Sequence, residues 1–279
     1  MCTAVLAQSP DVIIKTDLRL VYASERGGAN SVRWYDIMGR YSTVSLSFTL
    51  EPGFKALVSE RLQALEHTGD SELLDEYYIE DPGNWRLGKQ YLPFGRGVLL
   101  REAGRAARGE TSLFLEGLPV VLALCDSGPG QPRGAVGRIG GRIGISAAVG
   151  EHFATSASAL TPIRRPEDAP GKGEGYRLIV GADFSKRLGS VMVQGEFASL
   201  RQGEGSRSPE TDVSDLSFSI KPRPLTSVTV AWSRNWGSHT DFFRLEGSLP
   251  VYRGIALEPI VRMRGSSFWL GSVALRMKF

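Results

Sequence analysis

The feature that most constrains this chain is the alternation of apolar and polar residues, repeated in one segment after another. From Trp269 to Phe279 every second residue is mostly apolar, and the residues between them become polar toward the end. The segments 255–264, 228–233 and 176–185 repeat the pattern. A period of two is typical of β-strands whose two faces meet different surroundings. Helical periodicity is scarce, so the sequence predicts an all-β protein.

The connections between these segments alternate between tight and loose. Tight connections are expected at Glu51-Pro52-Gly53, Asp81-Pro82-Gly83, Gly117, Gly140-Gly141, Arg187-Leu188-Gly189, Pro222-Arg223-Pro224 and Pro250-Val251-Tyr252. Looser polar stretches, such as 92–109 and 152–175, separate them. Short turns on one side and long loops on the other are the layout of an outer-membrane barrel. We therefore predict a transmembrane antiparallel up-and-down β-barrel of about 16 strands over residues 10–279, with about 14 strands as the alternative.

Composition excludes several other classes of protein. Lys+Arg is 33 and Asp+Glu is 30, a balance that does not suit a nucleic-acid binder. No window of 18 apolar residues occurs, which excludes a helical membrane span but not a membrane β-barrel. The two Cys are far apart and the three His lie in or beside loose connections, so we expect no disulfide framework, metal site or other cofactor. No G-x-S-x-G motif occurs, and we expect no enzymatic activity.

The polar face of the strands would line a water-filled channel, whose selectivity depends on its width and its charges. The alternation predicts these pore-lining residues: Arg19, Arg61, Glu76, Arg86, Arg138, Arg142, Arg177, Asp183, Glu196, Arg244, Glu246, Glu258 and Arg262. Basic residues outnumber acidic ones on this face, which favours a weak preference for anions. The alternative is that the charges pair across strands and cancel.

Two short motifs resemble elements of the bacterial outer-membrane porin superfamily. Residues 87–95 (LGKQYLPFG) are similar to its "GKxYxPFG" element, which is also found in siderophore porins of the legiobactin-receptor type. Residues 75–79 (DEYYI) resemble the "DEAY" strand of the same families. Phe279, Met277 and Leu275 resemble the C-terminal signal by which such barrels reach their assembly machinery. The resemblance implies a trimeric or monomeric diffusion channel in the bacterial outer membrane, surrounded by lipid and lipopolysaccharide.

The third loose connection occupies the place of the loop that folds inward in porins and narrows the channel. It carries Arg96, Arg101, Glu102, Arg105 and Arg108. Arg101, Arg105 and Arg108 recur at helical spacing, so a short helix could present them together. Fixed guanidinium groups in a constriction would attract phosphates or carboxylates. The alternative is an exposed surface loop with solvated charges.

Residues 1–9 are interpreted as the remnant of a signal peptide or as a flexible N-terminus, because small residues precede Gln8 as in a cleavage site. The function predicted is passive diffusion of small hydrophilic, and by preference anionic, solutes. One alternative is a ligand-specific outer-membrane receptor or carrier barrel, such as a siderophore porin. Another is a soluble all-β binding protein. We expect no nucleic acid as a partner.

Overall fold

A computed structural model describes residues 11–25, 28, 30–33, 42–51, 53–62, 74–99, 103–113, 117–126, 133–153, 176–201, 210–223 and 226–279. These residues form strands and their connections, and none of them is helical. In this part of the chain no helix is long and apolar enough to cross a membrane. The N-terminal segment 1–9, interpreted above as a signal-peptide remnant, lies outside the described residues.

Seventeen strands follow one another along the chain. They are β1 (Asp11–Glu25), β2 (Ser31–Arg33), β3 (Thr43–Glu51), β4 (Phe54–Arg61), β5 (Leu74–Asp81), β6 (Trp85–Tyr91), β7 (Ala103–Leu113), β8 (Leu118–Asp126), β9 (Arg133–Gly140), β10 (Ile143–Phe153), β11 (Tyr176–Leu188), β12 (Val191–Arg201), β13 (Thr211–Arg223), β14 (Thr226–Asn235), β15 (Thr240–Tyr252), β16 (Ile255–Arg264) and β17 (Ser267–Lys278).

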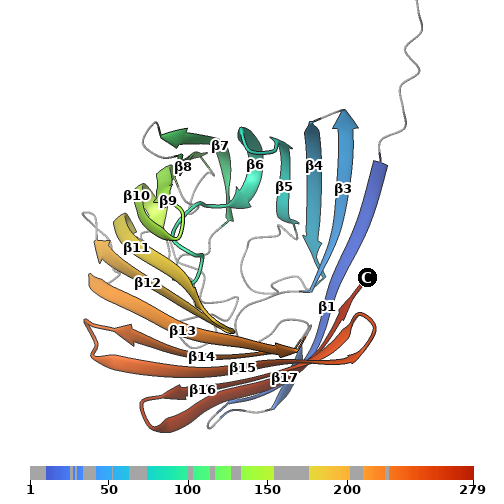
Figure 1. Ribbon diagram of the computed structural model, residues 1–279, viewed down its shortest axis with the longest axis vertical. Helices are drawn as coiled ribbons and strands as arrows, with labels where there is room; N and C mark the ends of the chain where they lie inside the picture. Colours follow the sequence, from blue (N-terminus) through green and yellow to red (C-terminus); the bar gives the residue numbers. More distant parts are fainter. Residues whose placement is uncertain are drawn as a thin grey trace, which may run out of the picture.

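From β3 to β17, each strand pairs antiparallel with the next, and β17 returns to β1 (Figure 1). Residues 11–17 of β1 pair with β3, and residues 17–25 pair with β17. The three-residue β2 pairs only with β1, at residues 21–23, so it adds no strand to the wall. The result is a closed 16-stranded barrel. This confirms the predicted fold, and it confirms 16 strands rather than the alternative of 14.

Closure depends on both ends of the chain. Phe279 and Thr16 exchange two backbone hydrogen bonds, with N···O distances of 3.0 and 3.2 Å. The first wall strand and the last one are therefore joined at the same end of the barrel as the tight turns. In a barrel of this kind the short turns face the periplasm. Every strand of the wall gains a partner on each side, which removes the exposed edge that a lipid environment would not tolerate.

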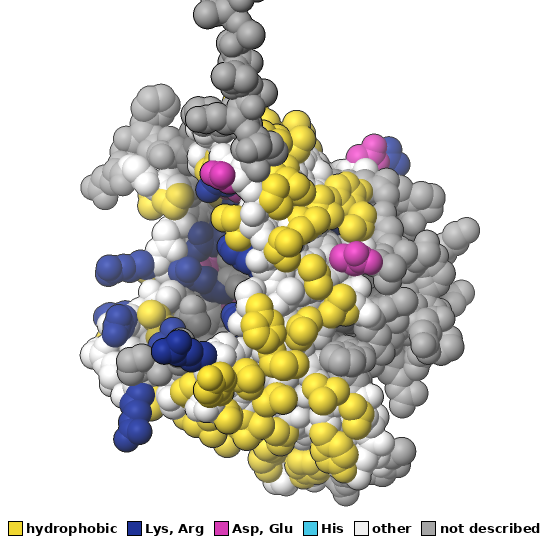
Figure 2. Space-filling model, turned by 90° about the vertical axis from the view of Figure 1, so that its right-hand side faces the viewer, with side chains coloured by type: hydrophobic (Ala, Val, Ile, Leu, Met, Phe, Trp, Pro, Cys, Tyr) yellow, Lys and Arg dark blue, Asp and Glu magenta, His cyan; other side chains and the backbone are white. Residues whose placement is uncertain are grey.

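The two faces of the wall differ in the way that the alternation predicted. Outward positions carry large apolar side chains that remain exposed, such as Leu122, Ile145, Val230 and Leu245. Figure 2 shows hydrophobic side chains covering much of the outer surface. Phe54 and Trp85 meet near the turn end, with ring centroids 5.8 Å apart, as in an interfacial aromatic girdle. Apolar side chains kept in contact with lipid lose no hydrophobic free energy, so this surface suits a bilayer.

One predicted boundary is wrong. The loose connection was expected to extend to Gly109, but β7 begins at Ala103. Arg105 and Arg108 therefore lie on a strand, where they pair with Lys89 and Arg86 of β6. The helical spacing of the arginines misled the prediction, because the backbone of residues 103–113 follows the β-ladder with β6 and β8 instead. Arg101 and Glu102 lie outside the described residues.

Candidate functional site: the inward-folded loop and the charged wall

The third loop begins where the two sequence motifs meet. Tyr91, at the end of β6, donates its hydroxyl to the Asp75 carboxylate at 3.1 Å, and its backbone N–H donates to Glu76 at 3.3 Å. Arg61 of β4 also donates to Asp75, at 2.7 Å. Three neighbouring strands thus fix the point at which the chain leaves the wall. Because β6 has only seven residues, the loop leaves below the height that the longer strands reach.

From Leu92 to Leu99 the loop lies inside the barrel, against the inward face of β10–β12. The Glu196 carboxylate, on the inward face of β12, accepts the backbone N–H groups of Arg96 and Val98 at 3.1 Å and of Leu99 at 3.4 Å. The Ser146 hydroxyl accepts the N–H of Gly95 at 2.9 Å. A buried backbone N–H group costs free energy unless it finds an acceptor. One buried carboxylate therefore satisfies three loop donors that secondary structure leaves unpaired.

An ion pair between a loop side chain and the wall also holds the loop in place. Arg96 Nε lies 2.8 Å from Asp183 Oδ1 on β11, and its guanidinium donates to the carbonyls of Gly141 and Arg142 at 2.9 Å. Arg138 of β9 contacts the same carboxylate at 2.7 Å. Asp183 is completely buried and has two guanidinium partners, so its charge is compensated inside the wall.

Small residues on the wall make room for this docking. A Cβ at Gly181 would lie 2.7 Å from the Phe94 ring, and a Cβ at Gly144 would lie 2.8 Å from Asp183 Oδ2. Phe94 therefore packs onto bare backbone. Gly95 has φ of +51°, and a Cβ there would lie 2.3 Å from Glu196 Oε1. The Pro93-Phe94-Gly95 part of the motif thus supplies the ring that packs and the glycine that approaches the carboxylate.

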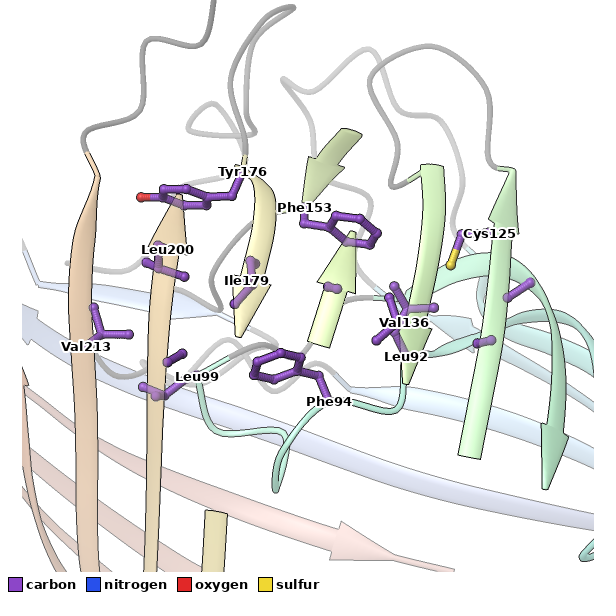
Figure 3. Packing of buried hydrophobic residues seen from close by; sticks show 14 of the residues in the cluster. Leu92, Phe94, Leu99, Cys125, Val136, Phe153, Tyr176, Ile179, Leu200 and Val213 are labelled. Atoms are coloured by element: carbon purple, nitrogen blue, oxygen red, sulfur yellow. The ribbon is translucent and has the colours of Figure 1, made fainter. Parts of the chain in front are cut away.

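Apolar side chains from the loop and the wall form one buried cluster within the barrel. Leu92, Phe94 and Leu99 meet side chains of β8–β13, and Figure 3 shows Phe94 and Leu99 beneath the row on the strands. The strand members of the cluster include Ala123, Cys125, Val136, Ala148, Phe153, Tyr176, Ile179, Ala198, Leu200 and Val213. The side chains on this side of the interior are therefore shielded from solvent, and the loop packs against them.

The wall of β16, β17 and β1 is charged instead. Arg19 and Arg276 stand directly opposite each other in the register of β1 and β17. Asp17 contacts both guanidiniums, at 3.2 and 2.8 Å, and Glu258 contacts Arg276 at 2.9 Å. Like charges opposed across a ladder repel. The two carboxylates offset that repulsion at the seam where the barrel closes.

A second opposed arginine pair lies on β15 and β16. Arg244 faces Arg262 in the register, and it contacts Glu246 at 2.5 Å and Asp215 at 3.8 Å. Arg262 is almost fully buried, with its guanidinium 4.9 Å from the centre of the Trp269 ring. Trp269 also packs on Phe242, with centroids 5.3 Å apart. A third pair, Arg86 and Arg108, is opposed on β6 and β7.

Most of the predicted pore-lining residues stand in the inward register of their strands, but their exposure differs. Arg142 lies in the β9–β10 turn, and Arg177 lies where the register of β10 and β11 is irregular. Arg19, Asp183, Glu196, Glu258 and Arg262 are buried among their partners. The remaining residues keep contact with solvent: Arg61, Glu76, Arg86, Arg138, Arg142, Arg177, Arg244 and Glu246. Of the loop residues, the structure describes the side chains of Arg96 and Arg108, and Arg108 contacts Glu110 of its own strand at 2.6 Å. The predicted loop set is therefore not brought together at one place among the described residues.

Sequence reasoning missed the partners of the loop. Ser146 and Gly181 carry no charge and no motif, so no pattern indicated that they receive the loop. Glu196 and Asp183 were interpreted as pore-lining acids, whereas the structure places them beneath the loop as its anchors. The signal that could have found this site is the Phe-Gly pair of the motif, because a ring followed by glycine indicates a close approach to another surface.

Several solved structures share this architecture at low sequence identity. The outer-membrane channel DcaP of Acinetobacter baumannii has 11% identity and a TM-score of 0.64, with 97% of each chain covered. The anion-selective porin from Comamonas acidovorans has 11% identity and a TM-score of 0.55, covering 97% of this chain and 99% of that one. The trimer form of OmpT, an outer membrane protein of Vibrio cholerae, has 9% identity and a TM-score of 0.57, covering 98% and 100%. No family model matches the sequence. No curated protein matches it either.

The closed barrel with a loop folded onto its inner wall defines the class: a β-barrel of the outer-membrane porin type. This chain has the fold of the bacterial outer-membrane porins, as the sequence predicted. At these low identities the likeness concerns the fold, and the finer resemblance to siderophore porins stays a prediction.

Proposed function

We propose that this protein is a passive outer-membrane channel for small hydrophilic solutes, without catalytic turnover, and that it prefers anions. The observation that carries the proposal is the inward loop, which Glu196 and Asp183 fix against one side of a closed barrel. A loop held by three amide hydrogen bonds and an ion pair narrows the lumen permanently. A narrowed lumen with charged walls is the arrangement that selects solutes by size and charge.

The preference for anions is supported by the side of the lumen that the loop leaves open. Arginines from six strands stand there in opposed pairs: Arg19 and Arg276, Arg244 and Arg262, and Arg86 and Arg108. Their carboxylate partners are largely buried, as Glu258 and Asp215 are. Guanidinium groups that keep a solvent-exposed edge, such as Arg86 and Arg244, would then interact with carboxylates or phosphates that pass. The comparison with an anion-selective porin is in keeping with this proposal.

The channel is tested by planar-bilayer recording with the purified protein. We expect stepwise conductance increases, and in a tenfold KCl gradient a reversal potential of the sign that chloride permeation gives. Liposome swelling with sugars of graded size would show a cutoff set by the loop. Absence of conductance would remove the channel itself, whereas a clear cation preference would remove only the anionic part.

The partners proposed with this function follow from the surface. The apolar outer band suits membrane lipid, with lipopolysaccharide in the outer leaflet, and the C-terminal strand ending in Phe279 suits the assembly machinery. A homotrimer is supported by the trimeric protein among the structural neighbours. Analytical ultracentrifugation in detergent would test the trimer, since the mass of one protomer is 30.4 kDa.

A further inference from the structure

Among the described residues, basic side chains are concentrated at the turn end of the barrel. Nine exposed basic residues lie there: Lys15, Lys55, Arg142, Lys186, Arg187, Lys221, Arg223, Arg253 and Lys278. They come from β1, β4, β11, β13 and β17 and from the β9–β10 and β15–β16 turns, so they surround the mouth. Among the acidic side chains described at this end, Asp11 is the one classed as exposed. The net charge of the whole chain is only +3, so this end is more basic than the rest.

Several of these residues border the lumen rather than the lipid. Lys15 pairs with Ser45, whose hydroxyl bonds to Ser59 on the inward face, and Lys55 pairs with the inward Glu80. Arg187 pairs with Met192 and Lys278 pairs with Asp17, both of which stand in the inward register. Figure 2 shows Lys and Arg side chains gathered at one margin of the molecule, around a hollow.

We propose that this ring of basic residues is an anion vestibule at the periplasmic mouth, which concentrates small, multiply charged anions and makes conduction asymmetric. The inference rests on the proposed channel function and adds a place and a direction to it. Fixed charge around a low-dielectric opening raises the local concentration of counter-ions, by more for a multivalent ion than for a monovalent one. When the voltage drives anions in through the ring, the lumen fills from an enriched solution. With the opposite voltage the lumen fills from the bulk solution, in which anions are not enriched.

The salt dependence of this effect is fixed by screening. The Debye length is about 10 Å at 0.1 M salt and about 3 Å at 1 M. Charges on opposite sides of the mouth act together only at the lower concentration. The asymmetry should therefore be present at 0.1 M and absent at 1 M, whereas an asymmetry that comes from the shape of the loop would persist at both.

The experiment is single-channel recording at both polarities. The orientation of the channel in the bilayer is determined by labelling an engineered thiol. Ser190→Cys, at an exposed and uncharged position of the β11–β12 turn, is labelled by a membrane-impermeant reagent from the side that the turns face, in a background with Cys125→Ser and Cys2→Ser. At 0.1 M KCl we expect a conductance roughly twice as large when anions enter through the ring, and a ratio of about 1 at 1 M. Phosphate added on the ring side should reduce the chloride current at lower concentration than phosphate added on the other side.

The variant Lys15→Gln/Lys55→Gln should lower the ratio, and Lys15→Glu/Lys55→Glu should lower it further or invert it. The matched control is Arg133→Gln/Arg264→Gln, which removes the same charge from exposed positions at the loop end and should keep the ratio. A conducting but symmetric wild-type channel, or equal ratios for the two neutralised variants, would overturn the vestibule and leave the channel intact. A protein that does not conduct would overturn the proposed function, and the vestibule with it.

Discussion

At the scale of single residues, the position of the loop inside the barrel is set by residues whose type alone does not indicate such a role. Glu196 is an acid on an inward-facing position, as a pore-lining residue would be, yet it satisfies three backbone donors of the loop. Gly95 is required because the backbone there adopts a left-handed φ against that carboxylate. The shape of the proposed solute path thus depends partly on residues that do not contact the solute.

Gly95→Ala tests this directly, and Gly97→Ala is its matched control. Both glycines have positive φ, of +51° and +71°, but a Cβ at Gly97 would have nothing within 4 Å. Both variants meet the backbone strain of a non-glycine residue, of about 1 kcal/mol. Only Gly95→Ala should displace Glu196, which would release the loop and produce a noisy, enlarged conductance. Equal single-channel behaviour of the two variants would show that the contact with Glu196 does not hold the loop.

At the scale of elements, the seam between β1 and β17 is the most demanding junction of the barrel. It places Arg19 directly opposite Arg276 and relies on Asp17 to contact both. Removing that carboxylate leaves Glu258 alone to offset two partly buried like charges in register. Burial makes such a loss costly, because the remaining charges are screened only weakly by solvent.

Asp17→Asn should therefore lower the free energy of unfolding by about 1–3 kcal/mol in a detergent urea titration, and should lower the temperature at which gel mobility changes. Asp126→Asn is the control, since Asp126 is mostly exposed and lies 3.7 Å from the exposed Arg133. Surface pairs of that kind contribute about 0–1 kcal/mol. If both substitutions had the same small effect, the ion cluster at the seam would not be stabilising closure.

The end of β17 has two separable roles. The backbone of Phe279 closes the barrel through Thr16, while its exposed ring is the end of the predicted assembly signal. Phe279→Ala keeps the backbone bonds and removes the ring. Refolding of Phe279→Ala into detergent should match the wild type, whereas its yield in the outer membrane of cells should fall several-fold. Deletion of Phe279 should impair both, and a normal cellular yield of Phe279→Ala would argue against the signal.

At the scale of the whole molecule, periodicity and turn spacing were sufficient to predict the architecture. Most of the tight turns fall between the expected strands, because a two-faced strand and a Pro- or Gly-containing turn are local properties. The turn predicted at Pro250-Val251-Tyr252 is wrong, since these residues belong to β15 and the chain turns at Arg253-Gly254. The short strand β2 and the start of β7 at Ala103 were not predicted, because both are defined by pairing with a neighbouring strand rather than by a local sequence pattern. Alternation also placed Glu196 on the inward face but could not tell which side of the interior the loop would cover. That depends on contacts about 100 residues apart.

The loop covers one side of the interior and leaves the charged side open, and thiol labelling can test this difference. Glu246 stands inward on β15 and keeps solvent contact, whereas Ala198 stands inward on β12 and is fully buried within the apolar cluster. In a background with Cys125→Ser and Cys2→Ser, a water-soluble thiol reagent should modify Glu246→Cys quickly and reduce the current. The same reagent should leave Ala198→Cys unmodified, because no aqueous path reaches it. Ala198→Cys in a Glu196→Ala background should become reactive, since loss of the anchor frees the loop that covers this wall. Rapid modification of Ala198→Cys with Glu196 intact would mean that solutes pass on both sides of the loop, and that the loop does not divide the lumen.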